Sequence, residues 1–199
     1  MIGNSIAGFL GNGVAVSASS FESISTVTVG AGGSSSISFT SIPSTYTHLQ
    51  VRGSYQTQRP SYITDDVYYY FNGDSTGTTY SWHNLVGGFG ATPTVAAGGG
   101  GNQPKNLLQW NSTTTGIAAS VQTACIIDIL DYANVNKYKT SRSLHGYDVN
   151  ANVSYAGTVA LSSGNWRNTA AINSVTFTTD SATGFAQYSK FALYGIKGA

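Results

Sequence analysis

Residues 34–55 constrain the fold of this chain most, because apolar and polar side chains alternate along them with a period of two. Ile37 and Phe39 stand between polar neighbours, and Leu49 and Val51 repeat the pattern further on. A period of two places the large apolar groups on one face of a strand and the polar groups on the other. The proline between the two runs fixes φ and lacks a backbone donor, so it belongs in a connection. The stretch therefore predicts two β-strands around one turn.

The same alternation recurs along the rest of the chain, with turn signals about every 8–12 residues and no convincing helix. We expect strands at residues 21–30, 35–42, 47–57, 67–72, 123–130, 138–149, 153–161, 171–179 and 185–197, and shorter ones at 105–110 and 116–121. Residues 80–85 are apolar and aromatic, and their pattern does not show which type of secondary structure they form. This pattern predicts an all-β protein, an antiparallel two-sheet β-sandwich that buries one face of each sheet.

Glycine marks several expected connections. Residues 30–33 predict a hairpin-type turn, and residues 164–167 predict another turn. The last two strands should form a pair joined near Asp180. Residues 87–103 contain seven glycines within a short span, including four in a row, so we expect a long surface loop there.

Charge is scarce in this chain: Asp, Glu, Lys and Arg make up 9% of the residues, and the formal net charge is +1. Average soluble domains carry roughly 25% charged residues. A nearly neutral protein has little electrostatic repulsion between its copies and associates readily. A nucleic-acid-binding protein would instead show clustered Lys and Arg. The composition thus favours a subunit of an assembly and argues against a nucleic-acid partner.

The first twenty residues differ in composition from the β-rich remainder, so we divide the chain into an extended N-terminal arm, residues 1–20, and a sandwich domain, residues 21–199. The arm has no charged side chain, yet it is too apolar for an ordinary solvated tail. Either the arm folds onto a neighbouring subunit, or its apolar groups pack on their own domain. Its candidate contact residues are Ile2, Ile6, Phe9, Leu10, Val14 and Val16. No apolar run approaches the ~20 residues of a transmembrane helix, so we expect no membrane partner.

Motifs for catalysis or metal binding are weak. Residues 73–77 match the G-x-S-x-G pattern around Ser75, but a turn sequence stands where a nucleophile elbow needs a strand-to-helix junction. The three histidines lie far apart, and zinc, EF-hand and phosphate-loop patterns are absent from the sequence. The single cysteine, Cys125, has apolar neighbours and reads as a small buried hydrophobe. We therefore expect a protein that is not an enzyme and uses no cofactor or metal.

Aromatic residues offer the one candidate ligand surface. The candidates are Tyr80 and Trp82. Exposed aromatic side chains near Asn and Asp are what a sugar-binding face would use, because the rings stack on apolar sugar faces and the polar groups bond the hydroxyls. Large aromatic side chains are highly buried on average, so a role in the core or at subunit contacts is favoured for them. Glycan or receptor binding remains the alternative function.

Five segments carry a family resemblance: FESISTVTV at residues 21–29, SSISFTSIPSTYTHLQV at 35–51, FNGD at 71–74, SGNWRNTAAINSVTF at 163–177 and FALYGIKG at 191–198. They resemble virion proteins of tailed bacteriophages that fold as a jelly-roll or lectin-like β-sandwich. The resemblance implies a capsid cement or decoration protein, or a tail-associated protein. It transfers no functional residue, because the matched segments look like determinants of the fold.

These observations combine into one expectation. The chain should be a bacteriophage structural protein that is made in the bacterial host cytoplasm and located on the capsid surface of the virion. Its partners would be the major capsid protein and other copies of itself, as a homotrimer, and its action would be to stabilise the shell by burying apolar surface between subunits. The alternative is a receptor- or glycan-binding module of a tail or fibre.

Overall fold

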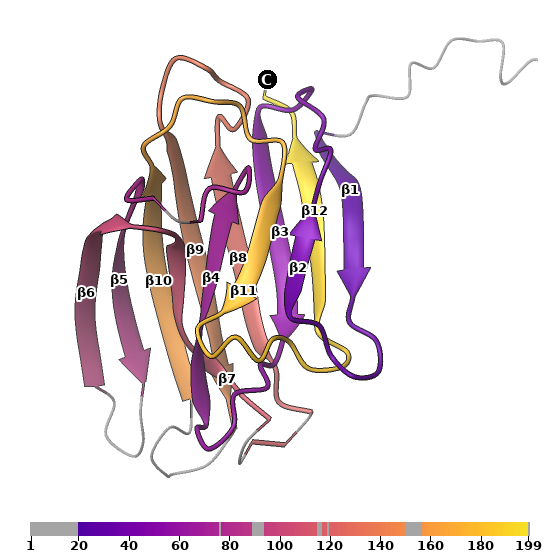
Figure 1. Cartoon of the computed structure of the whole chain (residues 1–199), viewed down its shortest axis with the longest axis vertical. Helices are drawn as coiled ribbons and strands as arrows, with labels where there is room; N and C mark the ends of the chain where they lie inside the picture. The colour runs from indigo at the N-terminus through magenta and orange to yellow at the C-terminus, as the bar shows by residue number, and fades with distance from the viewer. Residues whose placement is uncertain are drawn as a thin grey trace, which may run out of the picture.

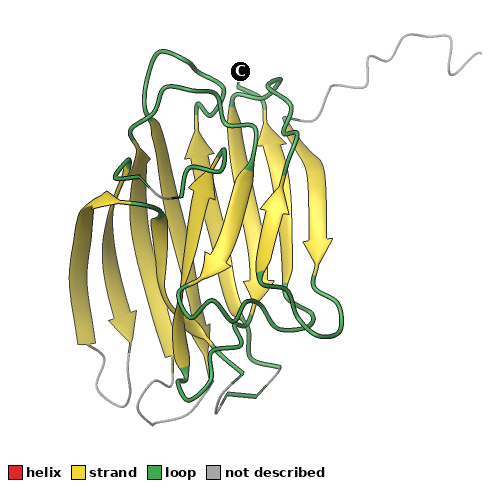
Figure 2. Cartoon of the chain, in the orientation of Figure 1, coloured by secondary structure: helices red, strands yellow, loops and turns green. Residues whose placement is uncertain are grey.

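The computed structural model describes residues 20–75, 77–88, 94–114, 117–118, 120–149 and 157–198, and within them the chain forms strands and loops with no helix (Figure 2). Every pairing between strands is antiparallel. The strands are β1 (Phe21–Thr28), β2 (Ser36–Phe39), β3 (His48–Tyr55), β4 (Thr64–Phe71), β5 (Tyr80–Gly88), β6 (Thr94–Gln103), β7 (Asn106–Ser112), β8 (Thr123–Leu130), β9 (Lys139–Asp148), β10 (Gly157–Trp166), β11 (Val175–Thr179) and β12 (Lys190–Ile196). The all-β prediction is confirmed.

Two sheets pack face to face (Figure 1). The larger sheet has the order β1-β12-β3-β8-β9-β10-β5-β6, and the smaller has the order β2-β11-β4-β7. Without β5, β6, β9 and β10, eight strands remain, and successive strands lie in opposite sheets except for β4 and β7, which are neighbours in the smaller sheet. This is the order of two Greek keys, which is a jelly roll. The four additional strands form two hairpins, β5–β6 and β9–β10, and both extend the larger sheet beyond β8.

The alternation between sheets corrects two expectations about connections. Residues 30–33 do not close a hairpin, because β1 lies in the larger sheet and β2 in the smaller one. The last two strands, β11 and β12, also belong to different sheets and do not pair. In each case the two strands bury their apolar faces against one another across the core, which a sandwich permits and a hairpin does not.

Three local predictions were also wrong. Residues 164–167 do not form a turn, because β10 runs through Trp166. The described part of residues 116–121 contains no strand. The predicted loop over residues 87–103 contains the whole of β6, the edge strand at the left of Figure 1.

The glycines of β6 are explained by the side chains of β5. Trp82, His83 and Asn84 pair with Gly100, Gly99 and Gly98, and each leans over its glycine partner. A Cβ at Gly98 would lie 2.7 Å from Asn84 Oδ1, and one at Gly99 would lie 2.5 Å from His83 Cδ2. The glycine run is therefore a strand that leaves room for large cross-strand neighbours, at the entropic cost that glycine carries in a strand.

The hydrophobic core fills the space between the jelly-roll strands. Rings of Phe177 and Phe191, from opposite sheets, lie 4.8 Å apart, and Tyr55 stacks on Phe191 at 4.9 Å. Trp166 closes the core at its other end, where its indole stacks on Tyr80. The core lies mainly beneath the jelly-roll strands. The inner side of the hairpin extension is instead covered by β7, which contacts β9, β10 and β5.

Candidate functional site

The hairpin extension reverses the usual distribution of polar and apolar side chains. In β9, Ser143 and His145 point inward and are buried, while Leu144 between them points outward. In β10, Ser162 is buried while Leu161 is exposed. A sheet of a soluble protein ordinarily places its aliphatic side chains inward and its polar ones outward. The outward aliphatic face is therefore the feature that needs a functional explanation.

Strand register assembles these outward side chains into two rows, which together we call the outer apolar face. Directly paired residues on neighbouring strands share one face of a sheet, so each row continues without interruption from β8 to β6. The first row is Ile126, Leu144, Leu161, Leu85 and Ala97. The second row is Ala124, Gly146, Val159, Gly87 and Val95.

The exposure of this face is large for aliphatic side chains. Relative exposure is 41% for Ile126, 52% for Leu144, 47% for Leu161, 50% for Leu85 and 57% for Val159. Single exposed aliphatic residues need no explanation, but contiguous apolar patches on a protein surface mark interaction sites. Neither row contains a charged residue. Covering the face would stabilise a complex by about 1 kcal/mol for each half-exposed aliphatic side chain.

The inner side of the extension holds a buried polar layer between β7 and the strands β9, β10 and β5. Each member has a side-chain atom without a hydrogen-bond partner among the described residues: Asn84 Oδ1, Asn106 Oδ1 and Nδ2, Ser143 Oγ, His145 Nδ1 and Ser162 Oγ. Ser162 pairs directly with Ser143 and with Asn84 on the two neighbouring strands. Buried polar groups without partners are costly and rare in folded proteins. This layer gives the extension little of the stability that an aliphatic interior would give.

Anchoring side chains hold the strands in this register. A slip by one residue would bury the aliphatic rows but would also expose Trp166, which is 1% exposed and donates from Nε1 to Asp74 Oδ2 at 2.7 Å. Gly164 faces Asn106, whose Oδ1 would lie 2.4 Å from an added Cβ, so a larger residue cannot take that place. Lys139, at the start of β9, is fully buried. The outward orientation of the aliphatic side chains is therefore imposed by the fold.

The two predicted ligand-binding aromatics have different outcomes. Tyr80 is fully buried, and its hydroxyl accepts a hydrogen bond from the backbone N–H of Phe71 at 2.9 Å, so it cannot stack on a surface ligand. Burial raises the pKa of its phenol above the usual value. Trp82 is partly exposed, and its indole lies over Gly100 on the inner side of the β5–β6 hairpin. Only Trp82 remains available for the alternative function.

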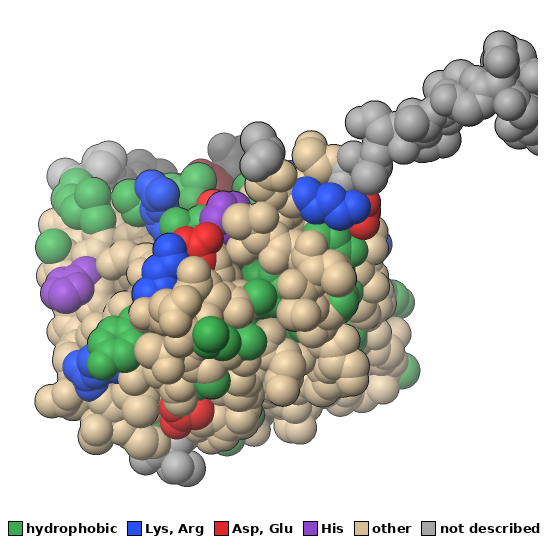
Figure 3. All heavy atoms as spheres, turned by 90° about the horizontal axis from the view of Figure 1, so that it is seen from above, with side chains coloured by type: hydrophobic (Ala, Val, Ile, Leu, Met, Phe, Trp, Pro, Cys, Tyr) green, Lys and Arg blue, Asp and Glu red, His purple; other side chains and the backbone are tan. Residues whose placement is uncertain are grey.

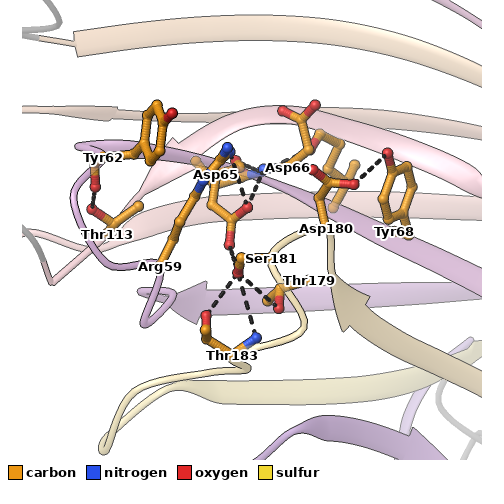
Figure 4. A network of polar contacts seen from close by, with 12 residues as sticks. Arg59, Tyr62, Asp65, Asp66, Tyr68, Thr113, Thr179, Asp180, Ser181 and Thr183 are labelled. Carbon is orange, nitrogen blue, oxygen red and sulfur yellow. Dashed lines mark hydrogen bonds and ion pairs between the residues drawn. The ribbon is translucent and has the colours of Figure 1, made fainter.

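The acidic pair at residues 65–66 is part of an internal network (Figure 4). The buried carboxylate of Asp65 accepts hydrogen bonds from Ser181 Oγ at 2.7 Å and from the backbone N–H of Asp66 at 2.9 Å, and it lies 3.6 Å from Arg59 Nη1. Burial raises the pKa of Asp65, and these partners act against that rise. Tyr68 donates to Asp180 at 3.2 Å, and burial raises the pKa of Tyr68 to about 12. The network ties β4 to the loop after β11.

Other chemistry-bearing residues serve the fold. Cys125 is buried in the core beneath Gly53, and desolvation raises its pKa to about 12, so it is a thiol at neutral pH. Ser75 follows the turn after β4, and the next described element is strand β5, not a helix. The described residues contain no group of three or more His, Cys, Asp or Glu side chains arranged to hold a metal.

Candidate contact residues of the N-terminal arm, from Ile2 to Val16, lie outside the described residues. The first described residue is Ser20, whose carbonyl oxygen accepts a hydrogen bond from the backbone N–H of Lys197 at 2.9 Å. In the described part of the chain no helix is long and apolar enough to cross a membrane. Charged side chains form only a few small groups on the end of the molecule seen in Figure 3.

We compared the chain with models of protein families, with curated proteins and with solved structures, and none of the three comparisons gave a match. The class of the protein therefore follows from its own strand order: it is a jelly roll with a larger sheet extended by two hairpins.

Proposed function

We propose that this chain is a structural protein of a bacteriophage particle, a subunit that attaches to the capsid surface and stabilises the shell. The observation that carries the proposal is the outer apolar face, which covers five neighbouring strands and contains no charge. Jelly rolls occur in viral capsid and lectin domains, so the fold is compatible with this role. The resemblance of residues 21–29 and 35–51 to phage virion proteins supports the same assignment.

The mechanism is passive burial. A neighbouring protein of the shell, the major capsid protein in this proposal, covers the outer apolar face and removes its aliphatic side chains from water. Each association gains about 25 cal/mol per Å² of apolar area, less the entropy of ordering the contacting segments. The rigid sheet presents the face without rearrangement, because Trp166 and Gly164 fix the register beneath it. Capsomers joined in this way need more free energy to separate.

A glycan-binding module is the second candidate, and Trp82 is the observation that favours it. Its partly exposed indole and the side chain of Gln103 both lie beside Gly100, within 3.0 and 3.1 Å of the position of an added Cβ. An aromatic ring beside an amide can stack on a sugar and bond its hydroxyls.

One binding experiment separates the two candidates. We expect Leu161→Lys to abolish attachment of the purified protein to phage particles made without it, because a charge would be buried in the contact. Val135→Lys is the matched control, since Val135 is similarly exposed at 62% but lies in the loop between β8 and β9. Occupancy on the particles is measured by quantitative gel or electron microscopy.

A structural role requires that Leu161→Lys loses occupancy while Val135→Lys and Trp82→Ala keep it. If Trp82→Ala abolishes binding to host cells and Leu161→Lys binds particles normally, the protein is a receptor-binding module and the first proposal is wrong. Circular dichroism confirms that each variant retains its β-structure.

A further inference from the structure

β6 lies at an edge of the larger sheet, where it pairs with β5 alone among the described strands. The other side of an edge strand presents unpaired backbone N–H and C=O groups, which can accept another strand. Natural sheets protect such edges with short strands, bulges, prolines and charged side chains. An edge strand that lacks all of these protections is therefore a candidate for pairing with a strand of another molecule.

The other three edges of the sandwich show such protection. β1 is interrupted by a register shift between Ser23 and Ser25, and Glu22 forms a salt bridge with Lys197 at 2.5 Å. β2 has only four residues. The pairing of β7 with β4 also contains a register shift, between Asp65 and Val67.

β6 has none of these protections along most of its length. Its ten residues, TVAAGGGGNQ, include no charged residue and no proline, and the register shift in its pairing with β5 lies near its end, opposite Tyr80 and Trp82. Residues 95–99 are all exposed. The small side chains of this stretch allow the backbone of another strand to approach closely.

We propose that β6 pairs edge to edge with β6 of a second copy, antiparallel about a two-fold axis. Two identical strands can meet in this way, and because β6 carries no charge the meeting places no like charges together. The other described edges match β6 poorly, since β1 is charged and bulged and β2 is short. The pair would join two eight-stranded sheets into one.

This pairing also has a consequence for the outer apolar face. Both rows end on β6, the first at Ala97 and the second at Val95. A two-fold pair brings the ends of the rows of both copies together, so one apolar surface spans the two subunits. The inference concerns self-association alone and does not depend on the proposed attachment to a capsid.

Hydrogen exchange of the β6 amides, combined with molar mass from light scattering, tests the pairing. Ala96→Lys places a charge on the edge strand, and Ala96 lies on the opposite face from Val95 and Ala97, so the outer apolar face stays intact. We expect the unaltered protein to have the mass of two copies, or of six if a trimer also forms. Ala96→Lys should raise the dissociation constant of the pair about tenfold or more.

We also expect the amides of residues 94–103 to exchange more slowly at high protein concentration in the unaltered protein, and not in Ala96→Lys. Val135→Lys should behave like the unaltered protein in both measurements. A monomer at all concentrations overturns the proposal. So does an oligomer that Leu161→Lys dissociates and Ala96→Lys does not, because that result assigns self-association to the outer apolar face. An equal unfolding free energy of the variants shows that the fold is intact.

Discussion

Two buried side chains in the extension have no sequence signature that predicts their environment. Lys139 is fully buried, and its ammonium donates to the carbonyl oxygens of Asn134, Lys137 and Thr169 at 2.5, 2.9 and 2.9 Å. His145 lies in the buried polar layer, where Nε2 contacts the carbonyl oxygen of Gln109 at 2.8 Å. A carbonyl can only accept, so the proton of the neutral ring is on Nε2.

Desolvation lowers the pKa of His145 below its ordinary value of 6.5. The unfolded chain therefore takes up a proton near pH 6.5, whereas the folded chain does so only at lower pH. Because the unfolded state then binds more protons, the free energy of unfolding should fall as the pH decreases below about 6.5, by at most about 1.4 kcal/mol per pH unit. His145→Gln cannot become charged and should show a smaller fall between neutral and mildly acidic pH.

Urea denaturation of both proteins at several pH values measures this difference. The window must stay above the range in which carboxylates titrate, because the raised pKa of Asp65 contributes with the opposite sign. An identical fall in both proteins would contradict the assignment to His145.

At the scale of the element, β6 shows that residue type alone does not define a loop. Glycine-rich residues 94–103 form a strand because β5 supplies both the hydrogen-bond ladder and the side chains that fill the space above the glycines. The sequence does contain a signal for this strand. The large side chains of Trp82, His83 and Asn84 need small cross-strand partners, and the glycine run supplies them.

Alanine substitutions within the glycine run test this account. Gly98→Ala should destabilise the fold by about 1–2 kcal/mol, because the new Cβ would meet the buried Asn84, whose Nδ2 donates to Gln109. Gly101→Ala is the matched control: nothing lies within 4 Å of its added Cβ, so we expect no loss or a gain of about 0.4–1 kcal/mol. Chemical denaturation measures both. Equal effects would mean that the leaning side chains do not dictate glycine.

For the whole molecule, the domain and the arm should be separable. β1 begins at Phe21, and the described contact across the boundary is the single hydrogen bond from Lys197 N–H to Ser20. Deleting residues 1–20 should therefore change the free energy of unfolding by no more than about 1.5 kcal/mol. If the arm folds onto a neighbouring subunit, the same deletion should weaken capsid binding.

Thermal denaturation and occupancy on particles measure the two effects separately. Unchanged occupancy would refute a role of the arm in attachment. A large loss of stability would instead show that the apolar side chains of the arm, among them Phe9 and Leu10, pack on their own domain.

Local sequence patterns were enough to predict the class of fold and most of its strands, because period-two alternation and turn residues act within each stretch of chain. The pattern predicted β8 at its observed bounds and β1, β3, β7 and β9 within two residues, whereas the strand predicted over residues 185–197 begins five residues before β12. It did not reveal which strands share a sheet, since the partners of β1, β2, β11 and β12 are distant in sequence and are chosen by burial across the core.

Which face of the hairpin extension is covered depends on contacts that form only in the folded protein. In β9 and β10 the alternation alone would have turned Leu144 and Leu161 inward. Trp166, Lys139 and the contacts of the polar layer with β7 instead fix the opposite orientation. A shift of one residue in strand register would turn every side chain to the opposite face. The register is set by all the cross-strand contacts together, so it cannot be read from any single stretch of the sequence.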